Sequence, residues 1–402
     1  MDINPQDSYL NDKSLCSPKS ITILGSTGSV GSNTVELVGN NLEYFKVVAL
    51  TANRNVDLLI SQALTLNPKK VVLADPEGYN KLKIALAGTG INVSSGIDAV
   101  VEAAEEPSDL VMASIVGAAG LKPTLAAVRR GATICLANKE CLVSAGDVFI
   151  REVKNSGSTL IPVDSEHSAI FQVFDFENVE KVRRIILTAS GGPFLKFTQK
   201  QMENVTPEDA IAHPNWDMGA KISVDSATMM NKGLELIEAF HLFPVTTKQI
   251  EILVHPQSVI HSMVDYVDGS VLAQLGMPDM RTPIAYALAW PKRMNTSTEK
   301  LDLHKIATLT FQNPDSDLFP ALSLARLALD SGGSAPTILN AANEIAVEHF
   351  LSKRIGFLDI TRIVSETLNF ITGCKIATLD DVAEADREAR KIAEEFVLKF
   401  KK

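Results

Sequence analysis

The segment Ile21-Thr-Ile-Leu-Gly-Ser-Thr-Gly-Ser-Val-Gly31 runs from a short apolar stretch into three glycines spaced G-x-x-G-x-x-G, and a helical pattern follows it. This order of strand, glycine turn and helix lets backbone N–H groups at a helix N-terminus receive a pyrophosphate. Because the spacing is not G-x-G-x-x-G, the glycines alone are also consistent with an ordinary turn. The preceding strand favours a dinucleotide site.

Apolar runs alternate with helical stretches from this segment up to residue 163. The runs are ITIL (21–24), VVALT (47–51), VVLA (71–74), LVMASI (110–115) and ATICLA (132–137). Such alternation is typical of βαβ units, whose strands form a parallel sheet covered by helices. We therefore expect a Rossmann-type parallel sheet in residues 20–163.

The pattern changes in residues 164–289, which we expect to form a mixed α+β domain. Asp268 and Gly269 lie between two apolar stretches and predict a hairpin. The other elements expected there are strands at 184–188 and 251–254, a mobile Gly/Pro-rich loop at 190–220 and a helix at 229–243.

The C-terminal residues 316–402 follow a proline-containing linker at 290–315 and show helical periodicity. Thr378 and Asp381 have the spacing of a capping box. The helices expected are 319–330, 336–353, 358–371 and 378–398, and four helices joined by short loops predict a small bundle. The whole chain is thus expected to be a multidomain α/β and α+β protein.

The 402-residue composition limits the classes of partner. The formal net charge is −10 and no stretch is dense in Lys or Arg, which argues against a nucleic-acid or anionic-membrane surface. The chain has no apolar stretch of the roughly 18 to 20 residues that a membrane helix needs. Four scattered cysteines predict neither a disulfide framework nor a thiolate zinc site. Residues 1–19 have no apolar run, so we expect a disordered extension on a cytoplasmic protein.

The residues after the second strand bear on the choice of nicotinamide cofactor. The stretch Asn53-Arg54-Asn55 offers no carboxylate where an NAD site would bind the ribose 2′-hydroxyl. The planar fork of an arginine suits a 2′-phosphate instead. We therefore expect NADPH, although a solvated loop cation is the alternative interpretation of Arg54.

An acidic stretch, Asp164-Ser165-Glu166, follows an apolar strand at the end where open α/β folds bind ligands. If the stretch is extended, residues 164 and 166 point the same way. A third carboxylate comes from Glu235 or Glu238, three residues apart on one helix face, and the spacing does not choose between them. Such oxygen ligands suit Mg²⁺ or Mn²⁺. A solvated surface pair is the alternative.

Four more polar positions fit an anion site. Lys139 follows the strand ATICLA, where its charge is able to face a developing oxyanion. Ser190 precedes a Gly-Gly turn whose backbone N–H groups suit an anion. Asn231 and Lys232 lie near the start of a helix and offer an amide and an ammonium group to a monophosphate. Singly, each of these residues is equally consistent with a structural role.

The loop at 190–220 also carries His213 and Trp216. An exposed tryptophan in a mobile segment commonly covers a bound ligand, because solvent exposure forgoes burial of its apolar surface. We therefore expect the loop to act as a lid.

Seven motifs occur in a fixed order: GSTGSVG, ANKE, PVDSEHSAIFQ, TASGGPF, HPNWDMGAKISVDSATMMNKGLELIEAFHLF, EILVHPQSVIHSMV and GMPDMRTPIAYAL. From about residue 20 to the C-terminus the chain resembles the 1-deoxy-D-xylulose 5-phosphate reductoisomerase family. The long fifth motif is the most specific. The resemblance implies a homodimer in the bacterial cytoplasm, with an NADPH domain, a catalytic domain with a mobile loop, and a C-terminal helical domain.

The implied reaction converts 1-deoxy-D-xylulose 5-phosphate into 2-C-methyl-D-erythritol 4-phosphate by rearrangement and reduction. The implied cofactors are NADPH and Mg²⁺ or Mn²⁺, with Co²⁺ as a further candidate. The implied metal ligands are Asp164, Glu166 and Glu235, which selects Glu235 over Glu238. The implied catalytic residues are Lys139, Glu166 and His213. The implied substrate-binding residues are Lys139, Ser165, Glu166, Ser190, His213, Trp216, Met218, Ser226, Asn231, Lys232 and Glu235.

The implied cofactor-binding residues are Thr27, Gly28, Ser29, Val30, Asn53, Arg54, Asn55, Asn138, Glu140 and Gly219. One of them departs from the family, because Asn53 stands where a glycine is usual. Asparagine tolerates positive φ better than most residues, so we expect a local adjustment there and an intact NADPH site.

Two other functions compete with this interpretation. A metal-dependent sugar-phosphate hydrolase or isomerase on a similar sheet would need no NADPH, and a nicotinamide fluorescence titration separates it. A non-catalytic dinucleotide sensor would keep the glycine turn but has no use for an acidic cluster beside Lys139.

Overall fold

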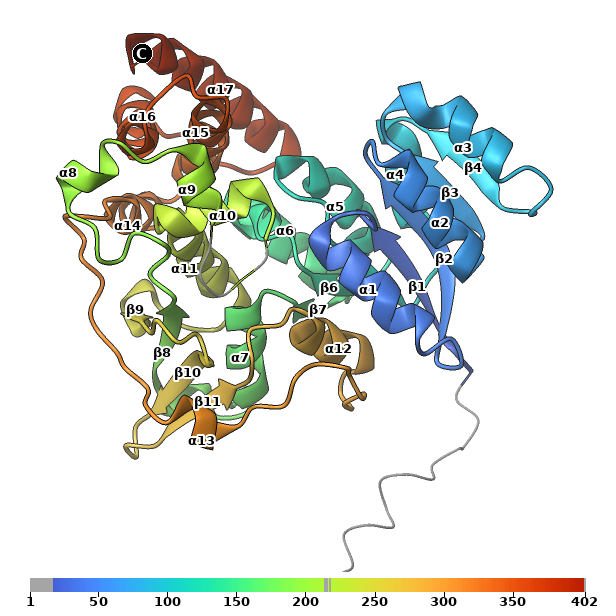
Figure 1. Ribbon diagram of the computed structural model, residues 1–402, viewed down its shortest axis with the longest axis horizontal. Coiled ribbons are helices and arrows are strands. Elements are labelled where there is room, and N and C mark those ends of the chain that lie inside the picture. Colours follow the sequence, from blue (N-terminus) through green and yellow to red (C-terminus); the bar gives the residue numbers. More distant parts are fainter. Residues whose placement is uncertain (1–16, 213–215, 217, 401–402) are drawn as a thin grey trace, which may run out of the picture.

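The computed structural model describes residues 17–212, 216 and 218–400. Two sheets lie side by side, and the C-terminal helices pack next to the second one (Figure 1). The expected extension at 1–19 falls outside this range except for its last three residues, and Lys19 already belongs to the first strand.

The first sheet has seven parallel strands in the order β4-β3-β2-β1-β5-β6-β7. They are β1 (Lys19–Leu24), β2 (Phe45–Ala52), β3 (Lys70–Leu73), β4 (Asn92–Ser95), β5 (Leu110–Ala113), β6 (Thr133–Leu136) and β7 (Thr159–Pro162). The expected Rossmann-type sheet is confirmed. Its edge strand β4 gave no signal because its sequence, NVSS, contains a single apolar residue.

Helices cover both faces of this sheet and bury its apolar side chains, including Ile21 and Ile23 on one face and Val111 and Ile134 on the other. They are α1 (Ser29–Gly39), α2 (Val56–Leu66), α3 (Tyr79–Ala85), α4 (Ile97–Glu105), α5 (Leu121–Arg129) and α6 (Glu140–Ser156), with 3₁₀ turns η1 (Pro76–Gly78) and η2 (Ala118–Gly120). Because the strands are parallel, their carboxyl ends meet at one edge of the sheet. Ligands of such folds bind at that edge.

The second sheet is mixed and has the order β11-β10-β8-β9. Its strands are β8 (Val182–Ala189), β9 (Ile250–Val254), β10 (Ile260–Tyr266) and β11 (Val271–Leu275). The helices around it are α7 (Ser165–Val173), α8 (Gln199–Met202), α9 (Pro207–Ile211), α10 (Ala220–Ala227) and α11 (Met230–Leu242), with 3₁₀ turns η3 (Val179–Lys181) and η4 (Thr247–Gln249). The hairpin predicted at Asp268 and Gly269 joins β10 to β11, and the predicted helix is α11.

The expected loop at 190–220 contains more regular structure than its composition indicates. Thr198 and Gln201 form a capping box that starts α8, and Thr206 and Asp209 form another that starts α9. Helices of four and five residues are too short to show periodicity. The mobility of this segment stays a prediction.

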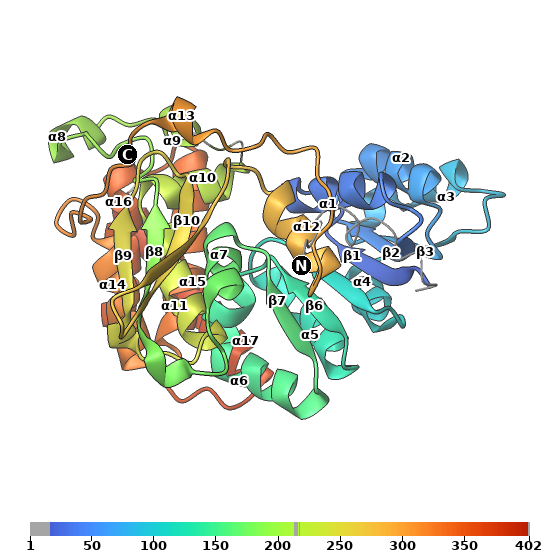
Figure 2. The ribbon, with the colours of Figure 1, turned by 90° about the horizontal axis from the view of Figure 1, so that it is seen from below.

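The chain then crosses between the two sheets (Figure 2). Helix α12 (Arg281–Ala289) packs against α1, and its Ile284 and Leu288 join the core of the first sheet. The segment 290–315 returns through α13 (Leu303–Ile306), and Gln312 pairs with Val254 of β9. One stretch of chain thus contacts both walls of the space between the sheets.

The four predicted C-terminal helices are present as α14 (Ala321–Ser331), α15 (Ala335–Leu351), α16 (Phe357–Phe370) and α17 (Leu379–Phe400). The capping box of Thr378 and Asp381 is also confirmed. These helices share one continuous core with the second sheet and α11. Its members include Ile185, Ile252, Leu234, Leu322, Leu339, Ile360 and Phe396.

Candidate active site

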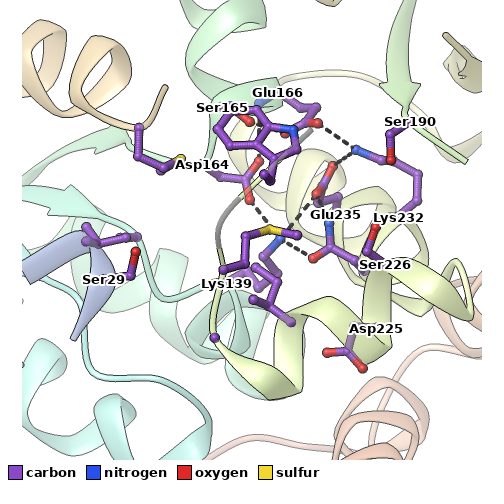
Figure 3. A pocket seen from close by; sticks show the side chains of 18 of the residues that line it. Ser29, Lys139, Asp164, Ser165, Glu166, Ser190, Asp225, Ser226, Lys232 and Glu235 are labelled. Carbon is purple, nitrogen blue, oxygen red and sulfur yellow. Dashed lines mark hydrogen bonds and ion pairs between the residues drawn. The ribbon is translucent and has the colours of Figure 1, made fainter. Parts of the chain in front are cut away.

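A cavity of about 430 Å³ lies between the two sheets. Gly28, Ser29, Val30 and Asp164 line it just after strands of the first sheet, and Glu235 lines it from α11 beside the second. Figure 3 shows the charged side chains of both parts pointing into one space. The glycine turn and the acidic residues, about 140 to 210 residues apart in sequence, therefore face the same cavity.

Close backbone packing shapes the glycine turn. A Cβ atom at Gly31 would lie 2.1 Å from the carbonyl oxygen of Gly25, so a larger residue does not fit. The Gln62 amide donates to the Ser26 carbonyl at 2.8 Å, and the Ser26 hydroxyl donates to Gln62 Oε1 at 2.7 Å. The turn, which includes Thr27, is thus held in place. It directs the N-terminus of α1 toward the cavity.

The residues after β2 lie outside the lining of this cavity. The Arg54 side chain is 83% exposed, and its Nε lies 2.9 Å from Asp75 Oδ2. Asn55 caps α2 by accepting from the Leu58 N–H. Asn53 does not adopt a left-handed conformation, so the expected local adjustment is not needed.

One carboxylate oxygen from each of Asp164, Glu166 and Glu235 lies within 4.8 Å of the other two. The expectation of an extended stretch at 164–166 was wrong. Asp164 is instead the N-cap of α7 and accepts from the Glu166 N–H at 3.3 Å. Because the first N–H groups of a helix need acceptors, capping overrides the extended conformation. The two carboxyl groups still converge, and Glu235 joins them from α11.

Two buried lysines contact these carboxylates. Lys139 Nζ lies 2.7 Å from Asp164 Oδ2 and 3.2 Å from Glu235 Oε1. Lys232 Nζ lies 3.1 Å from Glu166 Oε1 and also contacts Glu235 Oε2. Burial alone would lower the pKa of each lysine, but the carboxylates outweigh it and raise both pKa values.

The neighbouring acids respond differently to burial. Burial and the nearby Glu235 raise the pKa of Glu166 to about 7. Burial acts on Asp164 as well, but Lys139 and His167 hold the pKa of Asp164 well below its usual value. The Ser165 hydroxyl donates to Glu166 Oε2 at 2.6 Å and so orients that carboxyl group.

Glu238, the alternative third ligand, is linked to Asp164 through His167. The His167 Nδ1 lies 3.2 Å from Asp164 Oδ1 and 3.3 Å from Glu238 Oε2. The His167 Nε2 lies 2.9 Å from the backbone oxygen of Glu235. The structure therefore groups Glu235, and not Glu238, with the other two acids at the cavity.

The residues expected to hold a phosphate also line the cavity, and two of them, Asn231 and Lys232, contact Glu235. Ser190 follows β8, and its Oγ accepts from the Gly192 N–H at 3.1 Å. Gly192 has φ 68°, and a Cβ there would lie 2.7 Å from the Ser226 carbonyl oxygen. Met229 has φ 63° and turns the chain from α10 into α11, so that Ser226 and Asn231 line the same wall.

Trp216 and Met218 also line the cavity, whereas His213 lies outside the described residues. The Trp216 ring lies 6.0 Å from the His261 ring between centroids. Sequence reasoning missed His261 because it lies within strand β10, where all positions from Ile260 to Asp265 are buried. Burial lowers the pKa of His261 to about 4, so its imidazole is neutral near pH 7.

Of the remaining expected cofactor residues, Glu140 and Gly219 line the cavity but Asn138 does not. The buried Asn138 amide donates to the Ile115 and Gly117 carbonyls and accepts from the Cys141 N–H. Its side chain thus fixes the loop that follows β5.

Lys221 and Asp225 are lining residues that the sequence analysis did not single out. Lys221 Nζ lies 3.0 Å from Glu140 Oε1 and 2.8 Å from Asp225 Oδ2. The Asn343 amide of α15 donates to Asp225 Oδ1 at 2.7 Å. Lys221 and Asp225 lie four residues apart on α10. Glu140 and Asn343 reach them from α6 and α15, and only the fold reveals those two contacts.

The arrangement supplies three kinds of chemistry in one cavity. Three carboxylates offer hard oxygen ligands to a divalent cation. Lysine, hydroxyl and amide groups line the wall that suits an anion, and the glycine turn suits a pyrophosphate. Among the described residues, no helix combines the length and apolar character needed to cross a membrane.

Comparison with known families and relatives gives one consistent result. The family model described as 1-deoxy-D-xylulose 5-phosphate reductoisomerase matches residues 21–146, and two models of its C-terminal domains match residues 160–243 and 275–392. The reductoisomerase of Rhodospirillum centenum is 62% identical over 379 residues, which cover 94% of each chain. That of Zymomonas mobilis is 58% identical and covers 93% of this chain and 96% of the relative.

Solved structures agree. The Zymomonas mobilis enzyme in complex with NADPH superposes with a TM-score of 0.90 at 55% identity, covering 95% of this chain and 99% of that one. A reductoisomerase in complex with NADPH, fosmidomycin and magnesium has a TM-score of 0.89 at 44% identity, covering 94% and 98%. With this similarity over nearly its whole length, the chain belongs to the 1-deoxy-D-xylulose 5-phosphate reductoisomerase family.

Proposed function

We propose that this chain converts 1-deoxy-D-xylulose 5-phosphate into 2-C-methyl-D-erythritol 4-phosphate with NADPH and a divalent cation. The observation that carries the proposal is the single cavity that joins the glycine turn to Asp164, Glu166 and Glu235. A hydrolase or isomerase would not need the turn, and a dinucleotide sensor would not need the acids. Family membership supports the same substrate.

The proposed metal ligands are Asp164, Glu166 and Glu235, whose close oxygens fit a hard cation. Magnesium is present in related structures, and Mn²⁺ or Co²⁺ are proposed substitutes. When bound there, the cation supplies Lewis-acid polarisation of the substrate's carbonyl and hydroxyl oxygens. Ser165 holds the Glu166 carboxyl group in place.

Substrate binding is assigned to the walls around these acids. Lys139 is placed to stabilise negative charge on the substrate oxygens and, together with Glu166, to hold or move the proton of a substrate hydroxyl. The phosphate is assigned to Ser190, Ser226, Asn231 and Lys232. His213 stays a prediction for this subsite.

Trp216 and Met218 are proposed to cover the bound substrate and exclude water. When bound, NADPH supplies the hydride that reduces the aldehyde formed in the rearrangement. Its pyrophosphate is assigned to Thr27, Gly28, Ser29 and Val30, with Glu140 and Gly219 near the nicotinamide and Asn138 fixing the adjoining loop. Arg54, between Asn53 and Asn55, is assigned to the 2′-phosphate because most of its guanidinium is exposed.

The proposed assembly is a homodimer that pairs through the second sheet, at the hairpin around Asp268. Edge strand β11 has one neighbour, β10, and exposes Val271, Leu272 and Leu275, with Val267 close by. An exposed apolar edge favours pairing with another chain.

Light scattering after gel filtration tests this assembly with Leu272→Lys. We expect a dimer for the wild type and a monomer for this variant, because the lysine charge opposes apolar pairing at the edge. Leu64→Lys, at an exposed leucine of α2, serves as the control and stays dimeric. A monomeric wild type at micromolar concentration contradicts the proposal.

A bacterial cytoplasmic location is proposed because NADPH is supplied there, and cell fractionation tests it.

The catalytic proposal is tested by following NADPH oxidation with 1-deoxy-D-xylulose 5-phosphate and Mg²⁺. We expect oxidation that stops with EDTA and falls by at least about 1,000-fold in Asp164→Asn, because a mutated ligand removes the cation's contribution to the transition state. Folded protein that binds NADPH and Mg²⁺ but oxidises no NADPH would mean that the substrate is wrong.

A further inference from the structure

The contacts of Lys139 and Lys232 involve carboxylate oxygens of all three proposed metal ligands. Lys139 Nζ contacts Asp164 Oδ2 and Glu235 Oε1, and Lys232 Nζ contacts Glu166 Oε1 and Glu235 Oε2. Each of the three carboxylates therefore has an oxygen paired with an ammonium group, and both Glu235 oxygens are paired (Figure 3).

Burial makes these contacts strong. The side chains of Lys139 and Lys232 are 7% and 5% exposed, and that of Glu235 is 1% exposed. Carboxylates that lie within 4.8 Å of one another repel strongly where water does not screen them. The two ammonium groups offset two of the three negative charges and keep the acids together. A divalent cation at the three acids would compete for the same carboxylates.

We propose that Lys139 and Lys232 are internal counter-ions that compete with the divalent cation for Asp164, Glu166 and Glu235. Cation binding exchanges these ion pairs for metal–oxygen contacts and releases the ammonium groups toward the anionic substrate. This inference rests on the proposed function, and it adds the linkage between metal and substrate. The three acids are thereby preorganised before the cation binds.

Nearby groups give the released lysines other partners. Lys139 Nζ already lies 2.8 Å from Asn231 Oδ1, a neutral acceptor. Lys232 lies on the wall that holds Ser190 and Ser226, where the substrate phosphate is assigned. A phosphate there draws the ammonium group away from Glu166 and Glu235. By thermodynamic reciprocity, the anion and the cation therefore each strengthen the binding of the other.

Mn²⁺ binding measures the competition without catalysis. The full-length protein, free of NADPH and substrate, is titrated with Mn²⁺, and the free ion is followed by electron paramagnetic resonance. We expect Lys139→Met to bind Mn²⁺ at least about tenfold more tightly than the wild type, because a competing charge within 4 Å of two ligands is removed. Its melting temperature without cation is lower than that of the wild type, and Mn²⁺ raises it by a larger increment.

Lys221→Met is the matched control. Lys221 is also a lysine of the cavity with two carboxylate partners, and its side chain is 22% exposed; these partners are Glu140 and Asp225, outside the three acids. Its loss is expected to lower the melting temperature without changing the Mn²⁺ dissociation constant by more than about twofold, and Mn²⁺ does not restore the stability. An equal tightening in both variants overturns the proposal, because it would reflect net charge alone.

Two further results separate the inference from the metal site itself. If Asp164→Asn binds Mn²⁺ as well as the wild type does, the proposed metal site is wrong. If Asp164→Asn loses Mn²⁺ but Lys139→Met binds it no more tightly than the wild type, only the competition is wrong. Should Lys139→Met not fold, the wild type gives the answer alone. Saturating glycerol 3-phosphate is then expected to lower the Mn²⁺ dissociation constant several-fold, and no change overturns the linkage.

Discussion

Asp164 and Glu166 lie two residues apart, and their carboxyl groups face one cavity with opposite pKa shifts. The difference arises from partners, since Asp164 contacts Lys139 and His167 whereas Glu166 is next to Glu235. Both residues were identified from the sequence because they follow a strand at the ligand-binding edge of a parallel sheet. Their pKa values could not be predicted from the sequence, because Lys139 and Glu235 approach from other elements.

The choice between Glu235 and Glu238 leads to a prediction at this scale. Glu235→Gln is expected to raise the Mn²⁺ dissociation constant by about 100-fold or more, because it removes a direct ligand. Glu238→Gln alters a partner of His167 and none of the three grouped acids, and we expect about tenfold. Calorimetric titration of both variants measures the difference, and equal losses would contradict the placement.

His261 predicts a pH dependence of stability. Its pKa is about 4 in the folded protein, against about 6.5 when unfolded. The unfolded state therefore takes up a proton first, and stability that is complete above pH 6.5 is lost as the pH falls toward 4. Between pH 7.5 and 5.0 this one group removes about 2 kcal/mol from the free energy of unfolding.

Urea unfolding of the wild type and His261→Gln at both pH values tests this expectation. The variant lacks the titrating imidazole, so its free energy of unfolding should fall by about 2 kcal/mol less between pH 7.5 and 5.0. Parallel losses in the two proteins would show that His261 is not buried in its neutral form.

At the scale of elements, two glycines place one turn and one loop against their neighbours. Gly31 packs on the carbonyl of Gly25, and Gly192 packs on the carbonyl of Ser226. The GSTGSVG motif made the first turn predictable. The contact of Gly192 joins segments more than 30 residues apart, and sequence spacing does not reveal such a contact.

These two glycines predict separable losses. Gly31→Ala is expected to weaken NADPH binding by about tenfold or more, because the turn must open to admit the methyl group. Gly192→Ala is expected to raise the KM for the substrate without affecting NADPH binding, because both the close contact and its φ of 68° disfavour alanine. NADPH fluorescence and steady-state kinetics on both variants separate the effects. Each variant is the control for the other, and identical profiles would contradict the assignment.

Element prediction succeeded where periodicity was strong, as in α11 and the four C-terminal helices. It failed for β4, whose four residues are largely polar, and for α8 and α9, which are too short to show a period. The contribution of α12 to the first sheet was also unforeseen, because it depends on where the chain crosses over after β11.

At the scale of the whole molecule, the second sheet, α11 and the C-terminal helices share one core. Sequence punctuation at 290–315 indicated a linker but not this packing. The Asn343 to Asp225 hydrogen bond adds a polar link between α15 and the cavity.

The shared core predicts cooperative unfolding. Hydrogen exchange under mild denaturant is expected to show α11 and α14 to α16 losing protection together, because neither part buries its apolar face without the other. Asn343→Ala leaves Asp225 Oδ1 without that donor and should lower the free energy of unfolding of the whole unit by about 1 to 3 kcal/mol. Earlier, separate exchange of the C-terminal helices would show that they form an independent domain.

The central claim is that the glycine turn and the acidic cluster serve one reaction, and the fate of the hydride tests it most directly. The protein is incubated with 1-deoxy-D-xylulose 5-phosphate, Mg²⁺ and NADPH deuterated at both C4 positions of the nicotinamide, and the product is analysed by mass spectrometry and NMR. We predict 2-C-methyl-D-erythritol 4-phosphate that carries one deuterium in its newly formed CH₂OH group, with none formed by Asp164→Asn. A rearranged product without deuterium, or labelled product from Asp164→Asn at the wild-type rate, would contradict the account.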